Sequence, residues 1–138
     1  MLRKVRLIQV ASSLCFLTAI SFPALAQEAC LSLDTALTLV RAQEYAPLIA
    51  QAAEGTTPEQ VEFLSFMESG NWSAVYAATP VADPGYFFFE RVNSTNQFKD
   101  VWAGMADSSD QPELVKWAET LGAPTDLATC FAETAAAE

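Results

Sequence analysis

The sequence predicts a mainly α-helical fold: a small single-domain bundle of about five to six short helices, with at most one short strand or hairpin. The bundle is stapled by one disulfide between its N-terminal and C-terminal ends. Three observations predict this fold. Apolar residues recur at the i, i+3, i+4 and i+7 spacing of a helix face, helix start signals precede several of these runs, and Cys30 and Cys130 lie near opposite ends of the chain.

Residues 1–26 predict a cleaved signal peptide. Basic residues precede the apolar stretch Leu7–Ile20, and Ala24-Leu25-Ala26 supplies the small residues of a cleavage site. This stretch of 14 residues is shorter than the roughly 20 needed to span a bilayer, so we expect no stable membrane anchor after cleavage. Cleavage would leave 27–138 as a single acidic, mostly helical domain that is periplasmic or secreted.

The cysteine count supports a structural disulfide. Cys15 leaves with the signal, and Cys30 and Cys130 remain. Two cysteines in a small exported domain usually pair, and a loop of ~100 residues is worth ~4.7 kcal/mol on the chain-entropy model. A redox or nucleophilic cysteine is the rival interpretation, but the chain has no Cys-x-x-Cys and no histidine.

The first two expected helices occupy residues 32–69. Ser32 can cap a helix with Leu37 on its apolar face, and Pro47 is expected to break or kink it. Thr57, Pro58 and Gln60 form a capping box before a helix that ends at Gly70. Apolar residues cover much of this second helix, which is therefore expected to be the central one: Val61, Phe63, Leu64, Phe66 and Met67.

Residues 71–92 are expected to form one more short helix and the single strand that the sequence predicts. Asn71 can cap a helix that Pro80 ends, and a turn at Asp83-Pro84-Gly85 precedes an aromatic strand over 86–92. Three further helices follow. Their apolar faces are Phe98, Val101, Trp102 and Met105 for the first, Leu114, Trp117, Ala118 and Leu121 for the second, and Leu127, Cys130 and Phe131 for the last.

Charge limits the choice of partner. The whole chain has 17 acidic and seven basic residues, and after signal removal only Arg41, Arg91, Lys99 and Lys116 remain basic, for a side-chain charge of −13. Such a balance argues against nucleic acid and anionic lipid, which require a basic surface. It favours another protein as partner, in particular a cationic one.

Candidate sites are few because the chain has no histidine. We expect no catalytic set, no metal site and no cofactor; Asp107, Asp110 and Glu113 lack the spacing of a calcium loop. Glu90 is the best single carboxylate for catalysis, although it also fits an outward residue paired with a lysine or arginine. The candidate partner-binding surface is Trp72, Tyr86 and Glu90, because both rings lie beside turn residues.

Three functions fit these observations. The first is a small exported non-catalytic binding or accessory protein that acts through an acidic surface. The second is a pH-responsive envelope stress chaperone, in which protonation of carboxylates loosens the fold. The third is a carboxylate-dependent hydrolase. The sequons at Asn71 and Asn93 would matter only in a eukaryotic secretory pathway, and the sequence alone does not name the host; in a bacterium, which the form of the N-terminal signal favours, both are turn chemistry.

Overall fold

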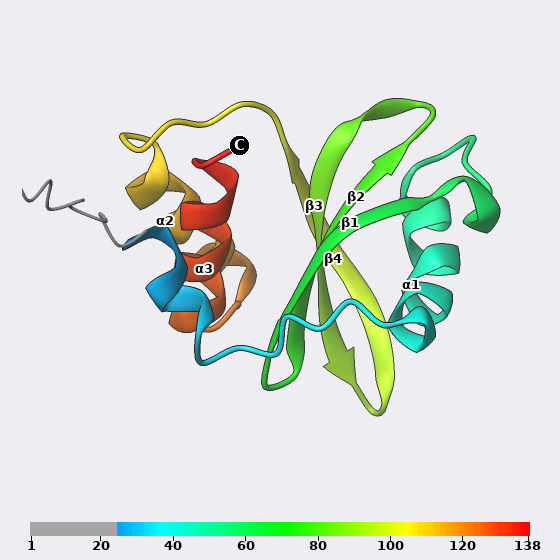
Figure 1. The fold of residues 1–138 in the computed structure, drawn as a ribbon. Helices are drawn as coiled ribbons and strands as arrows, with labels where there is room; N and C mark the ends of the chain where they lie inside the picture. The colour runs from blue at the N-terminus through cyan, green and yellow to red at the C-terminus, as the bar shows by residue number, and fades with distance from the viewer. Residues whose placement is uncertain (1–24) are drawn as a thin grey trace, which may run out of the picture.

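One antiparallel sheet with helices on both faces forms the fold of residues 25–138, the part of the chain that the computed structural model describes (Figure 1). Its four strands pair in chain order as a meander. Along the chain, the elements are the short 3-10 helix η1 (Leu25–Cys30), α1 (Leu39–Ala52), the 3-10 turn η2 (Pro58–Gln60), β1 (Glu62–Ser69), β2 (Trp72–Thr79), β3 (Ala82–Val92), β4 (Thr95–Ala103), α2 (Gln111–Leu121) and α3 (Thr125–Ala135).

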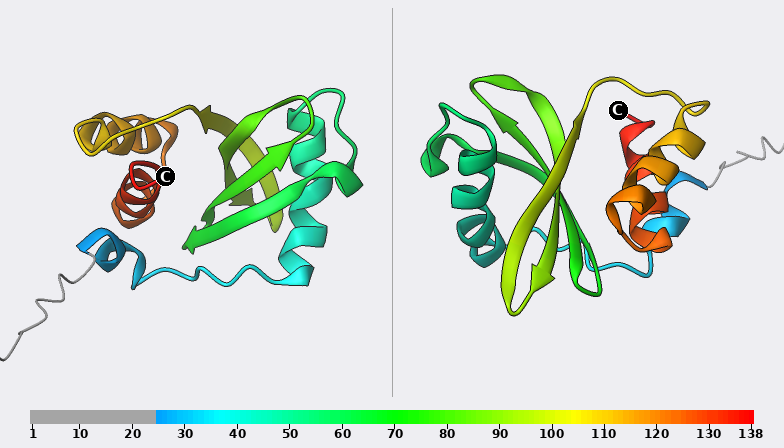
Figure 2. Two further views of the ribbon diagram at one scale, coloured as in Figure 1. Left: turned by 45° about the horizontal axis from the view of Figure 1, so that its top comes forward. Right: turned by 180° about the vertical axis from the view of Figure 1, so that it is seen from behind.

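The helices form two layers, one on each face of the sheet (Figures 1 and 2). α1 lies alone against one face, and η1, α2 and α3 gather on the other. The predicted disulfide between Cys30 and Cys130 is confirmed, and it joins η1 to α3 within the second layer. Both ends of the described chain therefore belong to the same layer.

The predicted mainly α-helical bundle is wrong, and β1 shows why. Residues 62–69, expected to lie in the central helix, form an edge strand. A register shift at Leu64 puts Phe63 opposite Ala77 and Phe66 opposite Val75, so both rings enter the core under α1. Their spacing of three, which normally indicates a helix, here results from one extra residue in a strand.

The helix expected over Phe98–Met105 is wrong for the same reason. These residues begin in β4, where Phe98 pairs with Phe89 and Val101 with Phe87. Lys99 is the extra residue between them, so two apolar side chains three apart share one sheet face. Met105 lies beyond the strand and is fully exposed.

The remaining helix predicted before the aromatic strand is also a strand. Residues 72–75 of β2 are all buried, because this central strand is covered by helices on both sides. A strand buried on both faces loses the alternation of apolar and polar residues that would identify it. The aromatic strand itself is confirmed as part of β3, and α2 and α3 form where helices were expected.

Two local predictions around α1 have mixed outcomes. The capping box of Thr57 and Gln60 is present, but it starts only the short turn η2. Pro47 was expected to break or kink the first helix, yet α1 continues through it to Ala52. Pro47 and the carbonyl-bearing Gln43 are both exposed, so the peptide oxygen left without a helix partner can bond to water.

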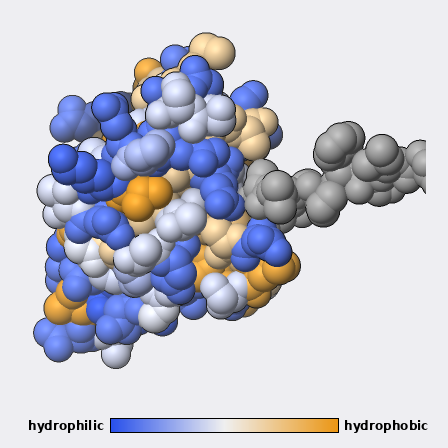
Figure 3. Space-filling model, turned by 90° about the vertical axis from the view of Figure 1, so that its left-hand side faces the viewer, coloured by the Kyte–Doolittle hydropathy of each residue, from blue (hydrophilic) through white to orange (hydrophobic). Residues whose placement is uncertain are grey.

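The predicted signal peptide, residues 1–26, lies almost wholly outside the described residues. None of the helices within 25–138 is long and apolar enough to cross a membrane. On the side formed by η1, α2 and α3, hydrophilic residues predominate and hydrophobic ones appear in separate spots (Figure 3).

Candidate functional site

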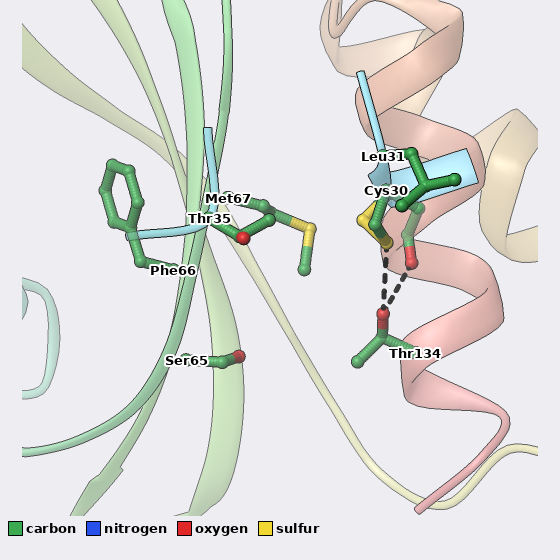
Figure 4. A pocket seen from close by; sticks show the side chains of 8 residues that line it. Cys30, Leu31, Thr35, Ser65, Phe66, Met67 and Thr134 are labelled. Atoms are coloured by element: carbon green, nitrogen blue, oxygen red, sulfur yellow. Dashed lines mark hydrogen bonds between the residues drawn. A yellow bond between two sulfur atoms is a disulfide. The ribbon is translucent and has the colours of Figure 1, made fainter. Parts of the chain in front are cut away.

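A cleft lies between the edge strand β1 and helix α3, next to the disulfide (Figure 4). We call it the β1–α3 cleft. Its volume of about 370 Å³ is in the range of protein ligand sites. Eight residues line it: Cys30, Leu31, Thr35, Ser65, Phe66, Met67, Cys130 and Thr134.

The sheet side of the cleft is built by the alternation of β1. Ser65 and Met67 point toward α3, whereas the ring of Phe66 between them points to the opposite face, under α1 (Figure 4). Thr35, from the segment that links η1 to α1, lies beside Met67 (Figure 4). The register shift at Leu64 therefore decides which side chains of β1 reach the cleft.

The helical side is held in place by the disulfide. Cys130 is buried on α3, and its bond to Cys30 brings Leu31 to the opening of the cleft with 79% of its surface exposed. The hydroxyl of Thr134 donates to the carbonyl of Cys130 at 2.7 Å. That bond turns the methyl group of Thr134 outward, so this wall presents mainly apolar atoms.

The hydroxyl of Ser65 is the unusual polar group of the cleft. Its oxygen is buried, and it forms no hydrogen bond with any described residue. Leaving such a group unpaired costs about 1–3 kcal/mol, and buried hydroxyls in native proteins are almost always paired with protein, water or ligand. None of the eight lining residues carries a charge, so the cleft is electrically neutral.

The free edge of β1 adjoins the cleft. The backbones of Glu68 and Asp34 form two hydrogen bonds with each other, at 3.2 and 2.9 Å. The segment between η1 and α1, called the linker below, therefore pairs with β1 at this one residue. The pairing stops there, since the N–H of Ala36 donates to the Asp34 carboxylate instead. Every second residue of an edge strand directs its backbone N–H and C=O away from the sheet, so Phe66 is the next residue after Glu68 to present them at this open edge.

Ionic contacts tie the segment between η1 and α1 to the end of β1. Arg41 of α1 pairs with both carboxylate oxygens of Asp34 and, at 3.3 Å, with Glu68. The hydrogen bond from Arg41, helped by the amide of Ala36, lowers the pKa of Asp34 to about 2. Arg41 also donates to the carbonyl of Ala36 and lies over the ring of Phe66, on the α1 side.

The structure buries two of the three residues from which a partner-binding surface was predicted, Trp72, Tyr86 and Glu90. Trp72 is only 7% exposed and Tyr86 fully buried, so both rings belong to the core under α2 and α3. Trp72 and Glu90 do pair across β2 and β3, and Lys99 lies 2.9 Å from the carboxylate of Glu90. An ion pair with a lysine or arginine was the alternative to a catalytic role for Glu90, and the structure shows this pair.

Tyr86 lies four residues before Glu90, near the middle of β3 and opposite Tyr76 of β2. Its ring stacks on Tyr76 at 4.4 Å and packs edge-on against Phe131 at 5.0 Å. Its hydroxyl donates to Glu138, and burial, followed by that carboxylate, raises its pKa. Tyr86 therefore contributes to packing rather than to an exposed surface.

The sequence did not indicate a cleft; among its lining residues it singled out Cys30 and Cys130, as a structural disulfide. Ser65 and Met67 were assigned to a helix, and nothing in their spacing indicated a shared site with Thr134. Among residues 25–138 no group of three or more acidic or cysteine side chains is arranged to hold a metal ion. The carboxylate of Asp107 instead accepts the amide and hydroxyl of Ser109, which lowers its pKa.

Comparison of the chain with protein-family models, curated proteins and solved structures finds no match. The properties of the cleft are therefore interpreted from its own chemistry.

Proposed function

We propose that this chain is a small exported, non-catalytic binding or accessory protein that holds another protein at the β1–α3 cleft. The observation that carries the proposal is the buried hydroxyl of Ser65, which has no partner in a neutral cleft of about 370 Å³. A ligand that fills the cleft and bonds to this oxygen removes the cost of leaving it unpaired. The disulfide supports a periplasmic or secreted location, because oxidising compartments preserve such bonds.

The charge of the chain supports a protein partner. The net charge of −10 would attract cationic surfaces and repel nucleic acid. The cleft itself is neutral, so an apolar side chain can enter it while basic residues of the partner stay near the acidic surface around it. This division of an apolar centre and a charged rim is common in protein interfaces.

The two other functions receive less support from the geometry. The carboxylate of Glu90, the best candidate for hydrolysis, is paired with Lys99 and lies away from the cleft residues. An acid-triggered chaperone needs carboxylates that titrate in mildly acidic conditions. The pair of Asp34 and Arg41, which helps to hold α1, keeps the pKa of Asp34 at about 2.

Site-specific photo-crosslinking in producing cells tests the proposal. Ser65 is replaced by p-benzoylphenylalanine, and the same replacement at Ser108, an exposed loop residue, is the matched control. We expect a discrete protein adduct from position 65 that position 108 does not form. No adduct at position 65, or the same adducts from both positions, would contradict binding at the cleft.

A further inference from the structure

We propose that the occupant of the cleft is an extended, cationic protein segment that adds as a strand to the edge of β1 at Phe66 and places an apolar side chain between Met67 and the disulfide. This inference rests on the proposed binding function and names its ligand class and binding mode. Strand addition gives affinity through backbone hydrogen bonds and selectivity through a pocket for alternate side chains. The cleft provides both next to each other.

The edge of β1 is open where the ligand would pair. Asp34 occupies the position opposite Glu68, and the linker then turns to the α1 side, where Arg41 holds the carbonyl of Ala36. Within residues 25–138, no backbone hydrogen bond from outside the sheet reaches Phe66. The register shift at Leu64 limits the added strand to a few residues, so binding is expected to be of moderate affinity.

The opposite edge of the sheet is a poorer site. On β4 the exposed side chains of Lys99 and Asp100 place charges on the edge, and the amide of Val101 donates to the Asp100 carboxylate at 2.8 Å. Charged side chains and a register shift, which oppose strand addition, occur on both edges, so the two edges differ in the engaged amide of Val101 on β4 and in the cleft beside β1. No pocket among the best-formed ones adjoins β4 in the described chain, which leaves β1 as the better site.

The pocket beside this edge fits an apolar side chain. Alternate residues of an added strand point toward α3, in the same direction as Ser65 and Met67. That direction leads to the neutral space bounded by the disulfide and Thr134. The ligand residue next to the one opposite Phe66 would fill this space with its side chain. The hydroxyl of Ser65 can bond to a polar atom of the same segment.

Charge selects a cationic segment over an acidic one and over a second copy of this chain. Glu62 is exposed at the start of β1. At its other end Asp34, Glu68 and the nearby Glu44 carry three negative charges, of which Arg41 and Arg91 offset two. Two copies paired antiparallel through β1 would bring Glu62 of one close to Glu68 of the other. Like charges opposite each other destabilise such pairing.

A defined peptide tests the inference. The probe is acetyl-Lys-Val-Lys-Val-Lys-Val-Lys-amide, titrated into the ¹⁵N-labelled, disulfide-bonded protein and followed by NMR. We expect a dissociation constant of about 1 mM or tighter, with the largest amide shifts at Ser65, Phe66, Met67 and Thr134. The same peptide with N-methyl groups on alternate residues cannot donate to the edge, and we expect it to bind at least about tenfold more weakly.

Two variants with equal charge change locate the binding. Leu31→Arg puts a cation at the opening of the cleft, and Met105→Arg puts one at a fully exposed site away from it. Both residues are exposed, so neither variant is expected to unfold. We expect Leu31→Arg to weaken binding at least about fivefold and Met105→Arg to have a much smaller effect.

Each contrary result has a separate meaning. Equal binding of the N-methylated peptide overturns strand addition, and equal binding of a Glu-Val peptide overturns the choice of a cationic segment. Equal effects of the two arginine variants, or no binding at several millimolar, overturn the inference as a whole. The proposed function is judged separately, by the crosslinks formed from positions 65 and 108, so the two failures are distinguishable.

Discussion

The two faces of the sheet are covered by the same kind of element but attached by different forces. On the α1 face, one helix is held by a small apolar cluster together with hydrogen bonds and ion pairs. On the α3 face, two helices and η1 are held by a larger aromatic core and a covalent bond. The α1 layer therefore depends on pH and salt, whereas the α3 layer depends on redox state and packing.

The polar attachments of α1 are concentrated near its first turns. Arg41 reaches Asp34 and Glu68, and Glu44 accepts from Asn96 of β4 at 2.6 Å. One turn further on, the buried hydroxyl of Tyr45 bonds to Ser73 at 2.8 Å. The α1 layer is thus positioned by directional contacts, since its apolar cluster is small.

The α3 layer is centred on Phe131. Its fully buried ring packs against Tyr86, Phe88, Trp102 and Trp117 at centroid distances between 5.0 and 5.8 Å. Aromatic packing of this kind contributes both buried area and edge-to-face attraction. The layer covers only part of β1: Met67 belongs to its core and Ser69 donates to Asp126 of α3, while the cleft is the uncovered remainder.

Removing the disulfide should have the largest effect and should act on the α3 layer. We expect the double variant Cys30→Ser, Cys130→Ser to lose about 4–5 kcal/mol of unfolding free energy, because the bond closes a loop of 100 residues. Urea unfolding measures the loss, and reduction of the unmodified protein should reproduce it. An unchanged midpoint in both experiments would show that packing alone holds this layer.

Truncating the centre of the aromatic core should come next. Phe131→Ala is expected to cost about 3–5 kcal/mol, the range for deleting a buried aromatic ring. Phe98→Ala is the matched control, since Phe98 is 41% exposed on the other face and should cost much less. Equal losses in urea unfolding would contradict the central position of Phe131.

A smaller loss is expected from the buried hydroxyl on the α1 face. Tyr45→Phe leaves the hydroxyl of Ser73 without a partner, which should cost about 1–3 kcal/mol. Adding Ser73→Ala removes the unpaired group and should recover part of that loss. If the double variant is no more stable than Tyr45→Phe alone, this hydrogen bond does not position the helix.

The smallest effect at neutral pH, and the one that distinguishes the layers best, concerns Asp34. Its pKa in the folded chain, about 2, lies below its ordinary 3.8, so its ionised form stabilises the fold above pH 3.8. That stability is lost as pH falls through about 2. Asp34→Asn should be less stable than the unmodified protein at pH 7, and the difference should shrink between pH 4 and 2.

Salt provides the control for the Asp34 prediction. The carboxylate is about half exposed, so 1 M salt should reduce the difference between Asp34→Asn and the unmodified protein at pH 7. The disulfide and Phe131 variants should keep their differences in the same buffer. Parallel stability curves for Asp34→Asn and the unmodified protein from pH 4 to 2 would contradict the ion pair.

The elements that sequence reasoning identified are those with strong end signals. Gly122, with a φ of 108°, ends α2 as expected. The aromatic strand is present, but the turn predicted at Asp83-Pro84-Gly85 is wrong, because these residues belong to β3 and the turn lies before them, at 80–81. The larger errors arise where one extra residue in a strand imitates helical spacing, at Leu64 and Lys99. Pairing between strands decides those segments, and spacing within one segment carries no information about its partner.

The candidate site was less predictable than the fold. Cys30 and Cys130 indicated where two distant segments meet, but Ser65 and Thr134 come together only because a sheet was formed where a helix was expected. Trp72 and Tyr86 were chosen for their neighbouring turns, and the fold buries both. Burial depends on the second layer of helices, which no local pattern in β2 or β3 specifies.

The meander has a consequence for the order in which the chain folds. Each strand pairs with the next, so the sheet can form from hairpins of adjacent residues as soon as the chain up to position 103 is free to fold. The layer over the α3 face of the sheet cannot be completed before Cys130, the disulfide partner of Cys30, has been synthesised. During that interval the aromatic side chains of the sheet are uncovered, and the nascent protein is then most exposed to aggregation and to chaperones.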